Sequence, residues 1–166
     1  MIAENKFAKK AWNDLLAGCE SHMKKGYEIP SPENNDYTKT TLHEKNADQI
    51  TALATAHILS GNKKPEYAKR AIEMLEKYSE VYASYGPTAN PTLKHDSSKA
   101  TWQRLNEAMW GIRLAIAYDF LMNDPSVFTA DKAQLIAEKL LRPIAMEIGK
   151  GNVFDAMTNW SAYDCT

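Results

Sequence analysis

Residues 101–122, with the sequence TWQRLNEAMWGIRLAIAYDFLM, form a long segment of the chain that keeps a helical pattern without a proline. Apolar residues recur in it at the three- and four-residue spacing of a buried helix face: Trp102, Leu105, Met109, Ile112 and Ile116. We therefore expect a central helix that begins near Ser98, ends before Asp124 and Pro125, and buries this face.

A second row on another face of this helix combines amide, aromatic and cationic side chains: Gln103, Asn106, Trp110 and Arg113. The row is more apolar than an ordinary solvated face and more polar than a core. We interpret it as the wall of a cleft that binds a polar ligand, with Trp110 or Trp102 as a sugar platform and the other in the core. For Arg113 the alternative is an ion pair with Glu107 or Asp119.

His95 lies in the loop that precedes the central helix. It is a candidate for the rim of the same cleft, and the alternative is a solvated loop histidine. His43 is followed by Glu44 and Asp48, which we interpret as a charge cluster at a helix start rather than a metal site. Neither a metal nor a cofactor is predicted.

Four further segments have helical patterns, at 3–25, 44–60, 65–85 and 129–149, with long polar loops at 27–42 and 87–98. The short link at 60–64 predicts an antiparallel hairpin of two helices. We expect the first helix to bury Phe7 and Cys19. The last helix is expected to bury Leu135, and Pro143 is expected either to kink it or to end its first part. No segment keeps the period-two pattern of a strand, so the fold class is all-α, built from antiparallel helical hairpins.

The composition indicates one globular domain of 166 residues. With 20 basic and 21 acidic residues and a net charge of −1, the chain has no basic excess to bind nucleic acid. No apolar run reaches the length of a membrane span, and residues 1–10 have no apolar core of a signal peptide. Cys19 and Cys165 are expected to be unpaired thiols.

Three sequence blocks resemble the alginate lyase and heparinase II/III-like polysaccharide lyases. Residues 53–78, LATAHILSGNKKPEYAKRAIEMLEKY, are similar to the first hairpin of these enzymes, with Ser-Gly-Asn followed by Tyr-Ala-x-x-Ala. Residues 105–121, LNEAMWGIRLAIAYDFL, resemble the next hairpin and its Ala-Tyr-Asp-x-Leu pattern. Residues 158–166, TNWSAYDCT, resemble the Asn-Trp motif of chondroitin AC-type and heparinase II-like lyases; alginate lyases often have Asn-His there.

The resemblance implies that residues 1–166 form a single helical domain, an incomplete N-terminal part of an (α/α) toroid. It implies β-elimination of a uronic-acid polysaccharide such as alginate, glucuronan or a glycosaminoglycan, in the periplasm or outside the cell. Asn159 would neutralise the substrate carboxylate, and Trp160 and Tyr163 would contact sugar; the alternatives are a helix N-cap for Asn159 and a core position for Trp160. No residue is assigned as the general base, so the fragment alone is expected to be inactive without the remainder of the lyase chain.

Two other functions remain open from the sequence. A toroid glycoside hydrolase needs two carboxylates that flank the scissile bond, and Asp119, Asp155 and Asp164 form no persuasive pair. A non-catalytic helical module that binds a partner protein predicts an exposed apolar groove and no polar-aromatic row.

Overall fold

The computed structural model describes residues 5–88 and 98–149, and this part of the chain is helical without any strand. The all-α prediction is confirmed. The helices are α1 (Lys6–Lys25), α2 (Thr40–Leu59), α3 (Pro65–Val81), α4 (Arg104–Leu121), α5 (Ala130–Ile136) and α6 (Arg142–Gly149). Three 3₁₀ turns, Pro32–Asn34, Tyr37–Lys39 and Tyr82–Ser84, and a π-helical turn, Ala137–Leu141, complete the described elements. Within the described ranges, no helix is long and apolar enough to cross a membrane.

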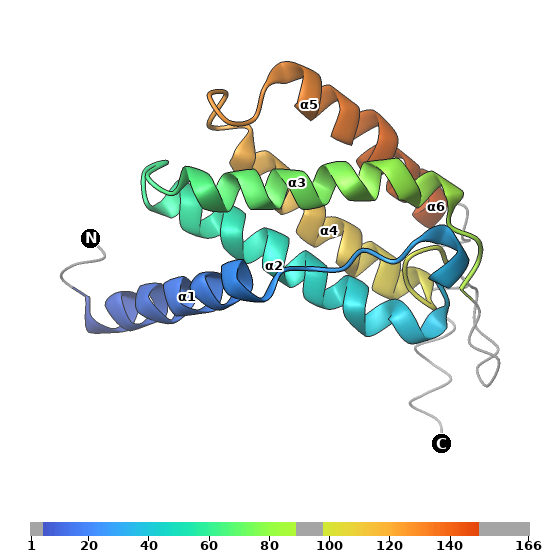
Figure 1. Cartoon of the computed structure of the whole chain (residues 1–166), viewed down its shortest axis with the longest axis horizontal. Helices are drawn as coiled ribbons and strands as arrows, with labels where there is room; N and C mark the ends of the chain where they lie inside the picture. Colours follow the sequence, from blue (N-terminus) through green and yellow to red (C-terminus); the bar gives the residue numbers. More distant parts are fainter. Residues whose placement is uncertain (1–4, 89–97, 150–166) are drawn as a thin grey trace.

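The helices alternate in direction along the chain (Figure 1). Helices α2 and α4 run one way, whereas α3 and the continuous α5–α6 helix run the other way. Helix α2 is central, since it packs against α1, α3 and α4. The α5–α6 helix contacts two neighbours in turn, with α5 against α3 and α6 against α4.

The predicted α2–α3 hairpin is confirmed. Gly61 and Asn62 both have positive φ angles, 70° and 62°, so the chain leaves α2 through two left-handed residues. Pro65 then occupies the first turn of α3, where its missing N–H costs no helical hydrogen bond. These local preferences explain why the Ser-Gly-Asn-x-x-Pro sequence folds the two helices back on each other.

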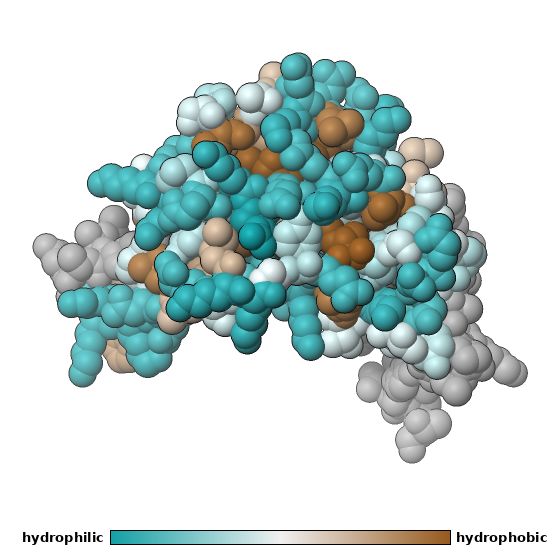
Figure 2. Space-filling view, in the orientation of Figure 1, coloured by the Kyte–Doolittle hydropathy of each residue, from teal (hydrophilic) through white to brown (hydrophobic). Residues whose placement is uncertain are grey.

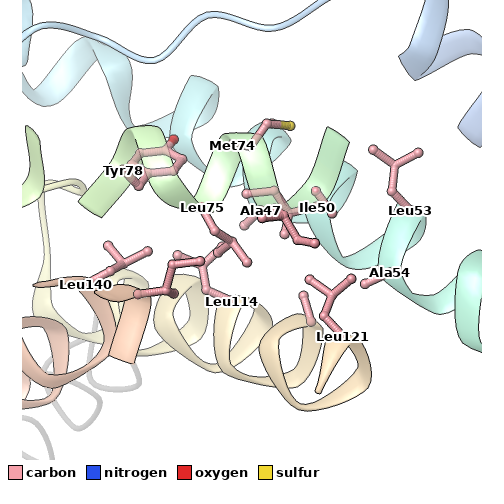
Figure 3. Close-up of a cluster of buried hydrophobic side chains, with 14 of the residues drawn as sticks. Ala47, Ile50, Leu53, Ala54, Met74, Leu75, Tyr78, Leu114, Leu121 and Leu140 are labelled. Atoms are coloured by element: carbon pink, nitrogen blue, oxygen red, sulfur yellow. The ribbon is translucent and has the colours of Figure 1, made fainter. Parts of the chain in front are cut away.

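The core lies between α2, α3, α4 and the π-helical turn (Figure 3). Leu75 of α3, Leu114 of α4 and Leu140 of the π-helical turn point into the same space and are fully buried. On the face that α3 crosses, most of the surface is hydrophilic, with separate hydrophobic patches (Figure 2). The other side of α3 is buried, with Tyr67, Ala71, Met74, Leu75 and Tyr78.

The predicted buried face of α4 is wrong. Leu105, Met109, Ile112 and Ile116 are 39%, 49%, 53% and 42% exposed. The buried side of α4 is instead the opposite one, with Glu107, Trp110, Gly111, Leu114, Ala117 and Leu121. Both sides have apolar residues at helical spacing, so periodicity did not distinguish them. Helix α4 also begins at Arg104, later than expected, after an irregular segment at 98–103.

Two smaller expectations also fail. Phe7 is 85% exposed and Leu135 is 43% exposed, so neither belongs to the core. Pro143 does not end its helix: the Arg142 N–H bonds to the Ala137 carbonyl, five residues back. This π-helical turn accommodates the proline, because it changes the bonding pattern where the Pro143 ring would otherwise meet the preceding turn.

Candidate functional site

The row on α4 is divided between the core and the surface. Trp110 is fully buried, and its indole N–H donates to the His43 carbonyl at 3.1 Å. A buried ring has no face on which a sugar can stack, so its interpretation as part of a cleft wall is wrong in this structure. Gln103 is the N-cap residue of α4 and is half-buried, and its side chain makes no capping hydrogen bond.

Arg113 lies on the side of α4 that faces α2. Its guanidinium donates to Asp48 Oδ1 at 3.0 Å, an ion pair between two helices rather than within one. The Arg113 side chain is 33% exposed and that of Asp48 is 64% exposed, so solvent screens this pair. Asn106 is half-buried, and it lies seven residues before Arg113, on the same side of the helix.

The remaining predicted site residues are His95, Asn159, Trp160 and Tyr163, and all four lie outside the described residues. Their roles stay predictions. Asn106 and Arg113 are therefore the part of the predicted site that the structure leaves at the surface of α4 together.

A buried polar network that the sequence did not reveal surrounds Trp110. Asn35 donates from Nδ2 to the Lys99 carbonyl at 2.8 Å, which leaves its Oδ1 to accept from His43 Nε2 at 2.7 Å. His43 Nδ1 then accepts from the Tyr78 hydroxyl at 2.9 Å. Asn46 completes the network by donating to the Tyr78 oxygen at 2.9 Å. These bonds assign His43 the neutral tautomer with a proton on Nε2.

His43 is consequently a structural histidine and not part of a charge cluster at a helix start. Burial lowers the pKa of His43 to about 4, and the side chain is fully inaccessible to solvent. Both ring nitrogens are occupied, so neither is available to abstract a substrate proton. The ring also packs edge-on against Trp110 and Tyr85.

Glu107 is a fully buried carboxylate at the start of α4. It accepts the Tyr82 hydroxyl at 2.7 Å, the Thr101 N–H at 2.8 Å, the Thr101 hydroxyl at 3.0 Å and the Ala100 N–H at 3.1 Å. Burial raises the pKa of Glu107, and these hydrogen bonds act in the opposite direction. The carboxylate thus connects the irregular segment before α4 to the 3₁₀ turn Tyr82–Ser84, which follows α3. It also raises the pKa of Tyr82, after burial as the main cause.

A second histidine links the end of α2 to the turn after α4. His57 Nε2 lies 3.0 Å from Asp124 Oδ2, and Asp124 Oδ1 accepts the Ser126 hydroxyl at 2.5 Å. The hydrogen bond from the Ser126 hydroxyl is the main cause that lowers the pKa of Asp124. Because His57 is fully buried, this pair holds two connections together rather than facing a ligand.

An open depression of about 370 Å³ lies where α1 ends beside α3, lined by Gly26, Tyr27, Ile29, Arg70, Glu73 and Lys77. The Tyr27 hydroxyl donates to Glu73 at 2.8 Å, and the Arg70 guanidinium lies 5.2 Å from the centre of the Tyr27 ring. Burial, followed by Glu73, raises the pKa of Tyr27. These side chains satisfy one another, and Tyr27 anchors its loop on α3.

No group of three His, Cys, Asp or Glu side chains within 5–88 and 98–149 is arranged to bind a metal ion. Cys19 is a free, fully buried thiol, as expected, whose Sγ lies 3.5 Å from the Ala52 carbonyl; Cys165 lies outside the described residues. Burial raises the pKa of Cys19 to about 11, so its nucleophilic thiolate is disfavoured.

Comparison with known proteins adds no assignment. No family model matches the chain, and no curated protein matches it significantly.

Proposed function

We propose that this chain is the N-terminal part of a lyase that cleaves a uronic-acid-containing polysaccharide by β-elimination. The supporting observation is that the first motif block, 53–78, coincides with an antiparallel hairpin, α2–α3, and that the second coincides with α4. Successive antiparallel helices are the building units of an (α/α) toroid. The toroid, the periplasmic or extracellular location and the acidic polysaccharide substrate belong to this proposal.

β-Elimination requires a hydrogen-bond donor that stabilises the negative charge on the substrate carboxylate while the C5 proton is removed. Asn159 supplies a neutral amide donor whose charge does not vary with pH. Among the described candidate residues, Arg113 is the cationic side chain suited to binding the substrate carboxylate. Its partner Asp48 is largely exposed. A substrate carboxylate can therefore compete with Asp48 for the guanidinium.

The test is incubation of the full-length protein with alginate, glucuronan, chondroitin and heparin, following the ultraviolet absorbance of the unsaturated product. Asn159→Ala should lower turnover by roughly 10²-fold or more with the fold intact. Asn123→Ala is the matched control, since it removes an exposed amide whose Nδ2 donates to the nearby carbonyls of Asp119 and Phe120. No unsaturated product from any of the four polymers refutes the lyase proposal.

A second candidate is a non-catalytic helical module that binds a partner protein. The exposed apolar side chains on α4 favour it, as does the burial of Trp110, which interrupts the polar-aromatic row. A toroid glycoside hydrolase has no comparable support: Asp119 is exposed, and Asp155 and Asp164 lie outside the described residues. The absence of lyase activity together with stable capture of one defined protein partner would favour the binding module.

A further inference from the structure

The loop that follows α1 runs beside α3 (Figure 1) and borders the open depression described above. The Glu28 carbonyl accepts from Asn46 Nδ2 at 2.7 Å, and the Pro30 carbonyl accepts from the Tyr85 hydroxyl at 2.8 Å. Asn46 and Tyr85 are buried, so the loop is attached to the core on both sides of Ile29, which lines the depression. This wall is therefore part of the fold and needs no ligand to form it.

Two cationic side chains of α3 line the depression. Arg70 and Lys77 are seven residues apart, so they lie on one side of the helix, about 10 Å apart along its axis. The Arg70 guanidinium is held over the Tyr27 ring, 5.2 Å from its centre. Side chains of a helix lean towards its N-terminus, which directs Lys77 towards Arg70. The two cations can therefore converge on one anionic group.

The donors of both cations lack hydrogen-bond acceptors in the described part of the chain. Glu73 balances the charge of Arg70, but the separation of 3.6 Å between Arg70 Nε and Glu73 Oε2 is too long for a hydrogen bond. Lys77 makes no hydrogen bond or ion pair with any residue in 5–88 or 98–149. The Arg70 side chain is only 23% exposed. A planar guanidinium with unused donors is well suited to binding a carboxylate through two hydrogen bonds.

The charges of the lining favour a ligand with one negative charge and several hydroxyl groups. Arg70 and Lys77 are cationic and Glu73 is anionic, so the lining has a net charge of +1. Glu73 would repel a dianion such as sulfate, whereas its carboxylate can accept hydrogen bonds from ligand hydroxyls. The volume of about 370 Å³ lies within the range of ligand sites, about 300–1,000 Å³.

We propose that this depression binds a sugar acid, with the carboxylate of the ligand at Arg70 and Lys77 and its hydroxyl groups at Glu73. The inference concerns binding rather than bond cleavage, so it does not depend on the lyase proposal. The probe is glucuronate, a monosaccharide that has no glycosidic bond to cleave.

The first test is a heteronuclear NMR titration of the full chain with sodium D-glucuronate. Saturable shifts should be confined to the backbone amides that border the depression and to the Arg70 Nε–H. A dissociation constant of about 1 mM is expected for a ligand of this size. Glucose has the hydroxyl groups without the carboxylate and should cause no saturable shift. Sulfate should bind more weakly than glucuronate because of Glu73.

The second test changes the charges of the lining one at a time. Lys77→Gln, at an exposed position, and Arg70→Lys, which keeps the charge but removes the planar fork, should each weaken glucuronate binding by about 10-fold. Glu73→Gln should strengthen sulfate binding. The matched control is Lys139→Gln, because Lys139 is an exposed lysine of the π-helical turn that does not line the depression, and it should leave the affinity unchanged.

Three results would overturn the proposal: no saturable glucuronate shifts, equal shifts with glucose, or an affinity that survives both Lys77→Gln and Arg70→Lys. Sulfate binding as tight as that of glucuronate would also overturn it, in favour of an unselective anion site. Cleavage of a polymer without glucuronate binding here would leave the lyase proposal standing and remove this one. Glucuronate binding without cleavage of any polymer would do the reverse.

Discussion

Helices α3 and α4 have similar lengths but expose different kinds of side chain to solvent. The exposed side of α3 is charged, with Glu66, Lys69, Glu73, Lys77 and Glu80, and its other side is buried. The exposed side of α4 is apolar, and its buried side contains a carboxylate, Glu107. The comparison teaches that a row of charged residues locates the exposed face of α3, whereas α4 has no such row and even buries a carboxylate. Where both faces are apolar, the neighbours decide which one is covered.

The largest effect should come from removing the side chain that fills the buried side of α4. Trp110→Ala should lower the free energy of unfolding by about 3–5 kcal/mol, because it opens a cavity and leaves the His43 carbonyl without its donor. Denaturant unfolding measures the loss. Met122→Ala, at an exposed end of the same helix, should change stability by no more than about 0.5 kcal/mol. Equal losses of unfolding free energy in the two variants would contradict the difference between the buried and the exposed positions of α4.

Acid should weaken the same buried side through His43. Burial holds the pKa of His43 at about 4 in the folded state, below the unfolded value near 6.5, so folding favours the neutral ring. Its contribution is complete above pH 6.5 and is lost as the pH falls from there through about 4. The loss is about 1.4 kcal/mol per pH unit in that window, or ~3 kcal/mol in all. Denaturant unfolding from pH 7.5 to 4.5 measures it.

The control for this pH dependence is His43→Gln, which has no ionisable ring. Its stability should fall less steeply than that of the wild type between pH 6.5 and 4. Identical slopes in the two proteins would mean that other groups cause the acid sensitivity.

A substitution at the close contact between α6 and α4 should have an intermediate effect on the free energy of unfolding. Gly111→Ala should destabilise the protein by about 1–3 kcal/mol, because the new methyl group meets Ile144 at 2.7 Å. Gly18→Ala in α1 should instead stabilise it by up to about 1 kcal/mol, since no atom lies within 4 Å and alanine favours helix. Thermal unfolding of both variants tests the contrast. Stabilisation by both substitutions would mean that α6 moves away from α4 at little energetic cost to make room for the new methyl group.

The smallest effect should come from the solvated edge of α4. Arg113→Ala should cost about 0.2–1 kcal/mol through loss of the Asp48 ion pair, and less at high salt. A double-mutant cycle with Asp48→Ala measures the coupling. A coupling well above that range, or one insensitive to salt, would mean that the pair is less screened than its exposure indicates.

The hairpin of α2 and α3 was predictable because its information is local. Gly61 and Pro65 mark the turn, and the charges of α3 mark its outer side. The buried network was not predictable, because Asn35, His43 and Tyr78 come from three segments and have no sequence signal in common. Arg113 likewise pairs 65 residues away with Asp48, although partners on its own helix were closer in sequence. The roles of Asn159, Trp160, Tyr163 and His95 remain predictions.

The π-helical turn Ala137–Leu141 explains how one helix serves two neighbours. In sequence the buried residues Ala133, Ile136, Leu140 and Ile144 follow a regular α-helical spacing, as if they met a single partner. A π turn takes more residues per revolution, so it unwinds the helix and rotates everything after it about the axis. The apolar line therefore passes from α3 to α4 along its length. If the same residues formed a regular α-helix instead, Ile144 would be rotated about the helix axis and would point away from Gly111.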